Sequence, residues 1–228
     1  DPRRTRITGP TDEQSFDPEA YIVRERTWVI VSKQGRIKRQ KGFSDVAAIR
    51  VPDGDEVGWV LRSDTTQTLI VCTQYGKAYT VRIDDITATT GYGDPIQSIF
   101  NFSDGERIVG VVSSDQKLHP VVVPDTPSLE DESNESDGAK PPFMIAISSA
   151  GRTTRVSMAS YHEVSTKNGR RFMSIGSNDV VLGVFASDGT ENIAVASQRG
   201  RAMLFAVTDI PPKSGTVKGV TAMKIDSG

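Results

Sequence analysis

A pattern that recurs four times constrains the fold of this 228-residue chain more than any other feature. Each copy is an apolar run, a short polar stretch, a glycine, a basic residue and a second run of alternating polarity. Glycine supplies the positive φ that a tight turn needs, so each copy predicts a β-hairpin. The copies are WVIVSKQGRIKR (28–39), LIVCTQYGKAYTV (69–81), MIAISSAGRTTRV (144–156) and IAVASQRGRAMLF (193–205).

A looser second half, with an acidic turn and a closing apolar strand, follows the first three hairpins at 51–61, 102–112 and 175–185. The turn glycines are spaced by 41, 75 and 49 residues, so one unit spans 40 to 50 residues and about four strands. Such a period is typical of radial β architectures, whose blades share a core. We therefore predict an all-β, propeller-like fold that is open or incomplete. The fourth unit lacks a closing strand, unless Tyr21–Val23 supplies it.

Charge is unevenly distributed around the net value of −2. Residues 124–142 hold six acids and one base, and their composition predicts a disordered insert. Residues 1–41 contain ten bases and six acids, and residues 143–228 also contain ten bases and six acids. Residues 42–123 contain six bases and eleven acids. Both ends are therefore basic and the middle is acidic. We predict that residues 1–19 form a poorly ordered lead-in and that residues 20–228 form one domain.

The sequence indicates no catalytic centre and no metal site. His119 and His162 stand in different units, without cysteine or glutamate at ligand spacing. Asp84 and Asp85 would point to opposite faces of an extended chain. Cys72 lies in an apolar run, which predicts a packed thiol. No apolar run approaches 18 residues and no signal core opens the chain, so we expect a cytoplasmic protein without a membrane span.

Three segments resemble the C-terminal domain of the A subunit of bacterial type II topoisomerases. DPRRTRI (1–7) is similar to the segment that leaves the breakage-reunion core of these enzymes. YIVRERTWVIVSKQGRIKRQKGFSD (21–45) resembles the first blade, and ITATTGYGDPIQSIFNFSDGERIVGVV (86–112) resembles a later one. The resemblance implies a β-pinwheel, in which four-stranded blades exchange strands with their neighbours.

The resemblance also implies a function. The domain would bind and bend double-stranded DNA and present it for ATP-dependent strand passage. ATP and magnesium would be used by the rest of the enzyme, an A2B2 assembly that also contains a B subunit, so no cofactor is expected in this fragment. The strand-cleaving tyrosine of the family lies outside these residues. We expect the isolated domain to be a monomer and the enzyme to be associated with the chromosome.

The resemblance is closer to topoisomerase IV than to gyrase. Gyrase carries a glutamine-arginine-arginine-glycine-glycine-lysine-glycine box in its first blade, whereas this chain passes from Arg36–Gly42 directly into Phe43. Residues 167–171 and 213–219 are the nearest remnants of that box. This departure favours decatenation or relaxation, with gyrase-type wrapping for negative supercoiling as the alternative. The acidic stretch 42–123 predicts a weak second blade, and hence bending without chiral wrapping.

The candidate DNA contacts are basic residues that recur at one position of the repeat. Equivalent positions of a radial repeat lie along its rim, and an arc of charge suits a bent polyanion because phosphate contacts need no base readout. A protein–protein interaction propeller, with 124–142 as a docking peptide, is the alternative of another class, and an independent enzyme ranks third. The candidates are Arg36, Lys38, Arg39, Lys41, Lys77, Arg152, Arg155, Lys167, Arg170, Arg171, Arg199, Arg201, Lys213 and Lys218.

Overall fold

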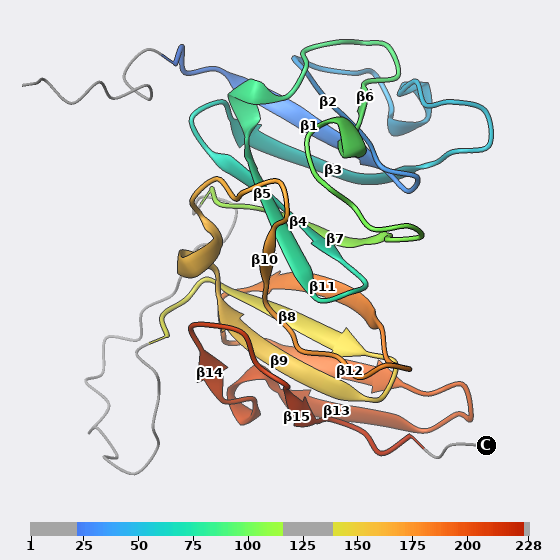
Figure 1. The fold of residues 1–228 in the computed structure, drawn as a ribbon, viewed down its shortest axis with the longest axis vertical. Coiled ribbons are helices and arrows are strands. Elements are labelled where there is room, and N and C mark those ends of the chain that lie inside the picture. Colours follow the sequence, from blue (N-terminus) through green and yellow to red (C-terminus); the bar gives the residue numbers. More distant parts are fainter. Residues whose placement is uncertain (1–21, 116–138, 226–228) are drawn as a thin grey trace, which may run out of the picture.

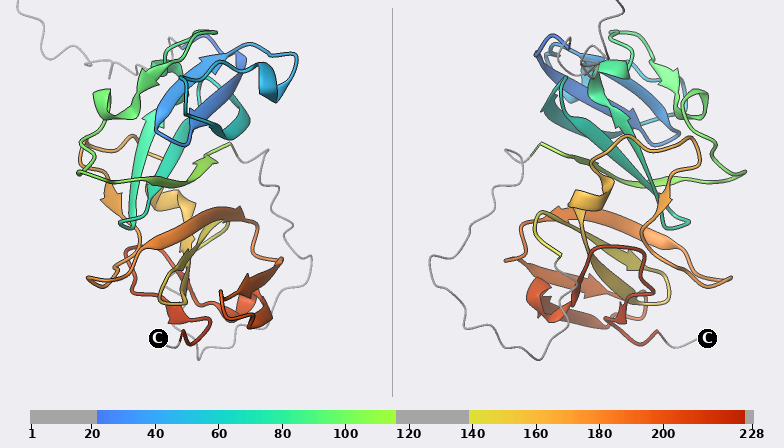
Figure 2. Two further views of the ribbon diagram at one scale, coloured as in Figure 1. Left: turned by 90° about the vertical axis from the view of Figure 1, so that its right-hand side faces the viewer. Right: turned by 60° about the vertical axis from the view of Figure 1, so that its left-hand side comes forward.

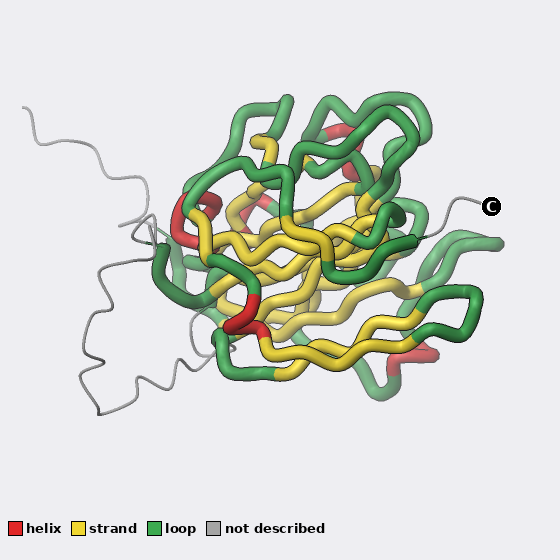
Figure 3. The backbone as a smooth tube through the Cα atoms, turned by 90° about the horizontal axis from the view of Figure 1, so that it is seen from below, coloured by secondary structure: helices red, strands yellow, loops and turns green. Residues whose placement is uncertain are grey.

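The computed structural model describes residues 22–115 and 139–225. Within these ranges the regular structure is almost entirely β-strand, and the helical turns are single 3-10 turns of three or four residues (Figure 3). The all-β prediction is therefore confirmed. The predicted lead-in and most of the predicted acidic insert lie outside the described residues. The 3-10 turns are η2 (Val46–Ala48), η3 (Ile83–Asp85), η4 (Ile96–Ser98), η6 (Met158–Tyr161) and η7 (Val207–Asp209).

The strands form four small sheets, here called blades 1 to 4, which follow one another along the long axis of the molecule (Figure 1). The two turned views show the same succession (Figure 2). Blade 1 has the strand order β3-β1-β2-β6 and blade 2 the order β10-β5-β4-β7. Blade 1 contains β1 (Arg26–Ser32), β2 (Arg36–Gln40), β3 (Val57–Asp64) and β6 (Asp94–Pro95), and blade 2 contains β4 (Thr68–Thr73), β5 (Lys77–Arg82), β7 (Ile108–Ser113) and β10 (Arg170–Arg171).

Blade 3 repeats this order as β11-β8-β9, and two short strands then pair with β9, β14 in parallel and β15 antiparallel. In the described part of the chain, blade 4 is the hairpin of β12 and β13 alone. Blade 3 contains β8 (Phe143–Ser148), β9 (Arg152–Ser157), β11 (Val181–Ser187), β14 (Pro212–Lys213) and β15 (Val220–Thr221), and blade 4 contains β12 (Asn192–Ala196) and β13 (Ala202–Ala206).

The N-terminal segment does not complete blade 4. The Val23 carbonyl accepts a hydrogen bond from the Thr65 hydroxyl at 2.8 Å, and the Glu25 amide donates to the same hydroxyl at 2.9 Å. Thr65 directly follows β3, so this segment lies along blade 1. The prediction that Tyr21–Val23 could supply the missing strand is therefore wrong for its described residues.

Three antiparallel strands, β6, β10 and β15, are exchanged between blades, in addition to the parallel strand β14 that also joins β9. In the sequence, each of these strands comes after the hairpin of one blade. In the structure, it pairs with the second hairpin strand of the blade before that one. Their register is the same in all three blades, because the residue after the turn glycine always faces the exchanged strand. The pairs are Arg36↔Pro95, Lys77↔Arg171 and Arg152↔Thr221. The strand exchange implied by the family resemblance is confirmed.

In blades 1 to 3, the turn glycine of the hairpin anchors the chain that leaves the exchanged strand. The Gly35 carbonyl accepts from the Ile96 amide at 2.8 Å, and the Gly76 carbonyl from the Phe172 amide at 2.9 Å. The Gly151 carbonyl accepts from the Ala222 amide at 2.9 Å. The chain that leaves the exchanged strand is called the crossing chain here. It passes so close that a Cβ on Gly76 or Gly151 would overlap one of its backbone carbonyls. The repeated glycine therefore provides both the positive φ and the space for the crossing chain.

The core lies between blades, because alternate residues of each strand face opposite neighbours. In β4, Leu69 and Val71 pack with blade 1, whereas Ile70 and Cys72 pack with blade 3. Strands β7 and β11 approach so closely that a Cβ on Gly110 would meet the backbone of β11. Burying one such aliphatic side chain contributes about 1.5–3 kcal/mol, so adjacent blades stabilise each other.

We expect Gly76→Ala to destabilise the fold more than Gly105→Ala does. Both glycines have a φ of +70°, which costs alanine about 1–2 kcal/mol. Only Gly76 also meets the crossing chain, whereas nothing lies within 4 Å of a Cβ at Gly105. The added overlap should cost about 1–3 kcal/mol more. Thermal unfolding measures the difference, and equal midpoints for the two variants would contradict the anchoring role.

Candidate nucleic-acid interface

Two basic residues face each other at the outer edge of blade 2. Lys77 on β5 pairs with Arg171 on β10, and such opposed residues have Cβ atoms about 4.5–5.5 Å apart on the same side of the sheet. Lys77 is half-buried and Arg171 is exposed, and neither has an acidic partner among the described residues. Like charges placed opposite each other are unfavourable unless an anion bridges them. This basic pair is thus a site at which a phosphate group would be stabilised.

The basic pair depends on strand exchange. Arg171 lies about 90 residues after Lys77 in the sequence and would be assigned to the third unit on sequence order. The structure instead places β10 in the sheet of blade 2. Arg171 therefore adds a positive charge to the edge of blade 2 that the count over residues 42–123 does not include.

The turn that precedes β10 carries Lys167, which is exposed. The Asn101 amide donates to the Lys167 carbonyl at 2.8 Å, and the Asn101 side chain donates to Asn168 at 3.0 Å. Blade 2 therefore holds this turn in place. Arg170 also lies on β10, but its guanidinium donates to the Ser160 carbonyl at 2.8 Å. Lys167 is thus the more available charge beside the basic pair.

Arg36 and Arg152 occupy the position of Lys77 in blades 1 and 3. The Arg36 guanidinium donates to the Gly93 carbonyl at 3.2 Å, and that of Arg152 donates to the Gly219 carbonyl at 2.8 Å. These acceptors are neutral, so each arginine holds the exchanged strand and keeps its net positive charge. Both stay candidates for phosphate contact.

Lys38 does not belong to the interface. It is 1% exposed, and its ammonium donates to the Arg50 carbonyl at 2.7 Å and to the Gly91 carbonyl at 2.6 Å. Burial lowers the pKa of this amine, and the nearby Arg50 charge lowers it further. The 42–50 loop covers Lys38, so its predicted DNA contact is contradicted. Its role is to tie that loop and the 89–93 segment to β2.

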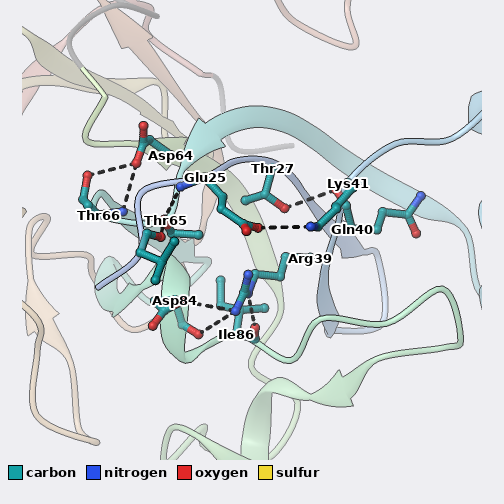
Figure 4. Close-up of polar contacts among 11 residues, drawn as sticks. Glu25, Thr27, Arg39, Gln40, Lys41, Asp64, Thr65, Thr66, Asp84 and Ile86 are labelled. Carbon is teal, nitrogen blue, oxygen red and sulfur yellow. Dashed lines mark hydrogen bonds and ion pairs between the residues drawn. The ribbon is translucent and has the colours of Figure 1, made fainter. Parts of the chain in front are cut away.

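Arg39 and Arg155 face the next blade. The Arg39 guanidinium donates to the Ile86 carbonyl at 2.8 Å and pairs with the Asp84 carboxylate at 3.1 Å (Figure 4). The Arg155 guanidinium lies 4.2 Å from the centre of the Phe143 ring, and burial lowers its pKa. Both residues lie four positions after the turn glycine, where strand alternation directs side chains between blades. Arg39 therefore ties β2 of blade 1 to the chain that follows β5 of blade 2, whereas Arg155 packs on a ring of its own blade. Both guanidinium groups are engaged within the fold, which contradicts their prediction as rim contacts.

The other predicted bases lie on blades 1, 3 and 4, and the 213–218 loop runs beside the basic pair, where the Thr216 hydroxyl donates to the Arg171 carbonyl at 2.6 Å. Lys41 is exposed and forms an ion pair with Glu25 at 3.5 Å (Figure 4). Lys218 is exposed in the loop before β15, and Lys213 is half-buried on β14. Arg199 and Arg201 are exposed at the turn of blade 4.

The sequence reasoning overlooked three exposed arginines of blade 1, namely Arg26, Arg50 and Arg62. They do not follow a turn glycine, so the repeat gave no reason to select them. The alternation of β1, which sets Arg26 and Trp28 on one face and Val29 on the other, was the available signal.

The candidate metal ligands of the sequence do not gather into a cluster in the described part of the chain. The described residues contain no group of three His, Cys, Asp or Glu side chains that could hold an ion. Cys72 is fully buried, which raises the pKa of its thiol and confirms the predicted packed cysteine. Burial lowers the pKa of His162, while His119 lies outside the described ranges. None of the helices described is long and apolar enough to cross a membrane.

Blades with exchanged strands and basic residues at a recurring edge position define a propeller-like repeat domain. The family model of the DNA gyrase C-terminal domain, a β-propeller, matches residues 67–115 and 191–228. Over 99% of its length the chain is 23% identical to the A subunit of DNA gyrase from Haloquadratum walsbyi, covering 25% of that protein. Over 48% of its length it is 29% identical to the A subunit of DNA topoisomerase 4 from Caulobacter vibrioides, covering 16% of that protein.

A crystal structure of the C-terminal domain of DNA topoisomerase IV shares the fold. Its TM-score is 0.71 at 16% identity, and the match covers 91% of this chain and 59% of that one. By sequence this chain is similar to the A subunits of gyrase and topoisomerase IV, and by fold to the C-terminal domain of topoisomerase IV. The chain spans a quarter or less of the length of the two curated relatives.

Lys38→Met and Lys77→Met should separate stability from DNA binding. The first variant leaves two carbonyls without their donor, and we expect it to lose about 1–3 kcal/mol of unfolding free energy with little loss of DNA affinity. The second should keep its stability and weaken duplex binding. Thermal unfolding and fluorescence anisotropy of a labelled duplex measure the two effects. A Lys38→Met variant that stays folded but loses DNA would contradict the structural role of this lysine.

Proposed function

We propose that this domain binds and bends double-stranded DNA without sequence preference, as part of a type II topoisomerase. The observation that carries the proposal is the basic pair, Lys77 and Arg171, which has no acidic partner among the described residues. The names of the curated relatives support the same assignment.

The proposed contacts are to phosphate groups. The basic residues lie at the edges of small sheets, and the helical turns among the described residues are too short to enter the major groove as a recognition helix. Contacts to the backbone position a duplex without reading its bases. Bending a site of 20–30 base pairs by 40–90° costs about 1–6 kcal/mol, which several phosphate contacts offset. Lys77, Arg171, Lys167, Arg36 and Arg152 would supply those contacts.

In the whole enzyme this domain would deliver DNA to a breakage-reunion core that lies outside the present chain. The enzyme would use ATP and magnesium elsewhere and would form an A2B2 assembly with a B subunit, in the bacterial cytoplasm and on the chromosome. The domain itself would contribute no catalytic residue or cofactor site and would be a monomer when isolated.

We further propose a topoisomerase IV-like role in decatenation and relaxation. Blade 1 has no glycine-rich basic box, and its Lys38 and Arg39 are engaged within the fold, so it offers little to capture a duplex entering the rim. A gyrase-type wrap is the alternative, favoured by the shared register of Arg36, Lys77 and Arg152 in successive blades. An interaction propeller is the alternative of another class.

The variant Lys77→Glu/Arg171→Glu should weaken binding to every duplex sequence alike. Each lost phosphate contact should lower the slope of log K against log salt by about 0.9. Titration of labelled duplexes at several salt concentrations measures both effects. Lys33→Glu/Arg107→Glu is the matched control, since it makes the same change of charge at two exposed residues outside the basic pair. Equal losses in the two variants, or a preference for one sequence, would favour incidental binding and the interaction propeller.

The two topoisomerase roles differ in chirality. We expect the domain to leave the linking-number distribution of a relaxed, ligase-closed plasmid nearly centred, at concentrations where gel shift reports binding. The reason is that the strongest charge cluster lies on one blade and does not run along the whole rim. A large positive shift that grows with protein concentration would show a gyrase-type wrap and overturn the topoisomerase IV-like assignment.

A further inference from the structure

The face of blade 1 that points away from blade 2 is a second basic surface. Val29 and Val31 of β1 pack in the core shared with blade 2, so Trp28, which directly precedes Val29, points the other way. Arg62 on β3 lies opposite Trp28, and Arg26 lies two residues before it on the same side of β1. We call the surface formed by Arg26, Trp28, Arg50 and Arg62 the end face.

A loop holds part of the end face rigid. The Phe43 ring packs edge-on against Trp28, with ring centres 5.1 Å apart. Ile49 is 6% exposed, and the buried Lys38 ammonium binds the Arg50 carbonyl at 2.7 Å. These contacts fix the backbone of Arg50 over the sheet. The exposed arginines therefore project from a preorganised surface, which lowers the entropic cost of binding.

The charges on the end face are unbalanced. Among the nearby acids, Asp64 pairs with Arg24 at 2.8 Å. Glu25 pairs with Lys41 at 3.5 Å (Figure 4). Asp45, in the loop over this face, accepts from the Ala47 amide at 3.0 Å. Arg26, Arg50 and Arg62 have no carboxylate partner among the described residues. The Arg62 guanidinium lies 5.7 Å from the Trp28 ring centre, which holds its side chain over the sheet. Three neighbouring arginines without a carboxylate partner suit a ligand with regularly spaced negative charge.

We infer that the end face binds a second DNA duplex through its phosphates, so that one domain holds two duplexes. The inference rests on the proposed function, because the first duplex occupies the basic pair of blade 2. The end face looks away from blade 2, and the two surfaces are built from different blades. A duplex at the edge of blade 2 would reach the end face only by bending around blade 1, and capture of a second duplex distinguishes that case from two bound duplexes. Two duplexes held by one domain match the need of a strand-passing enzyme to bring two segments together.

A bridging experiment tests the inference with the 228-residue chain. One duplex is fixed to beads, the domain is added, and capture of a second, fluorescent duplex is measured. Wild-type protein should capture the second duplex. Arg26→Glu/Arg62→Glu should bind the first duplex nearly as well but capture at least about tenfold less of the second, because two phosphate contacts become repulsive. Arg26→Lys/Arg62→Lys keeps the charge and should keep capture.

Trp28 provides a readout that reports on the end face alone. With Trp59→Phe, Trp28 is the only tryptophan of the chain, and its emission should change as the second duplex binds. The variant Lys77→Glu/Arg171→Glu should lose the first duplex and keep this response. Absence of any duplex binding by the wild-type protein would sink the proposed function. Normal binding to one duplex, with capture unchanged in Arg26→Glu/Arg62→Glu, would overturn only the end-face inference.

Discussion

The hydrogen bond from the crossing chain to the carbonyl of each turn glycine is the interaction on which the structure depends. The bond is made at Gly35, Gly76 and Gly151. At each of them it joins the hairpin turn of a blade to the chain that leaves the strand exchanged into that blade. Each blade is thus completed by residues that follow the next hairpin. A blade therefore cannot form fully before its successor, and blades become coupled through the backbone as well as through their shared cores. The absence of a side chain at these glycines is what allows the close approach.

Strand alternation then sorts the basic residues into distinct roles. The residue after the turn glycine lies beside the exchanged strand at the edge of the blade, as Lys77 does. The residue four positions after that glycine faces the next blade, where Arg39 and Arg155 become structural connections. The same residue type at neighbouring positions of one strand therefore serves either DNA or the fold. Charge counted along the sequence cannot make this distinction, because it ignores which way each side chain points.

Strand exchange also decides where positive charge accumulates. Arg171 belongs by sequence to the third unit, yet it strengthens the edge of blade 2, where the acidic stretch 42–123 would otherwise dominate. The proposed phosphate contacts are therefore assembled from two units of the repeat. Blade 1 has a different arrangement, in which its arginines gather on the face that points away from blade 2 and that none of the other described blades covers. A domain with charge at these two places is suited to hold DNA segments that approach from different directions.

The sequence by itself determined the all-β class, the hairpins and their closing strands, the packed Cys72 and the recurring basic residue. These features follow from local rules: glycine at the turn, alternation along each strand, and a regular period. Only the tertiary structure decided that Lys38 is buried, that Arg155 lies against Phe143, and that Lys77 meets Arg171. These outcomes depend on contacts between segments far apart in the chain. The sequence pattern shows that a strand exists, but packing and strand exchange determine its neighbours.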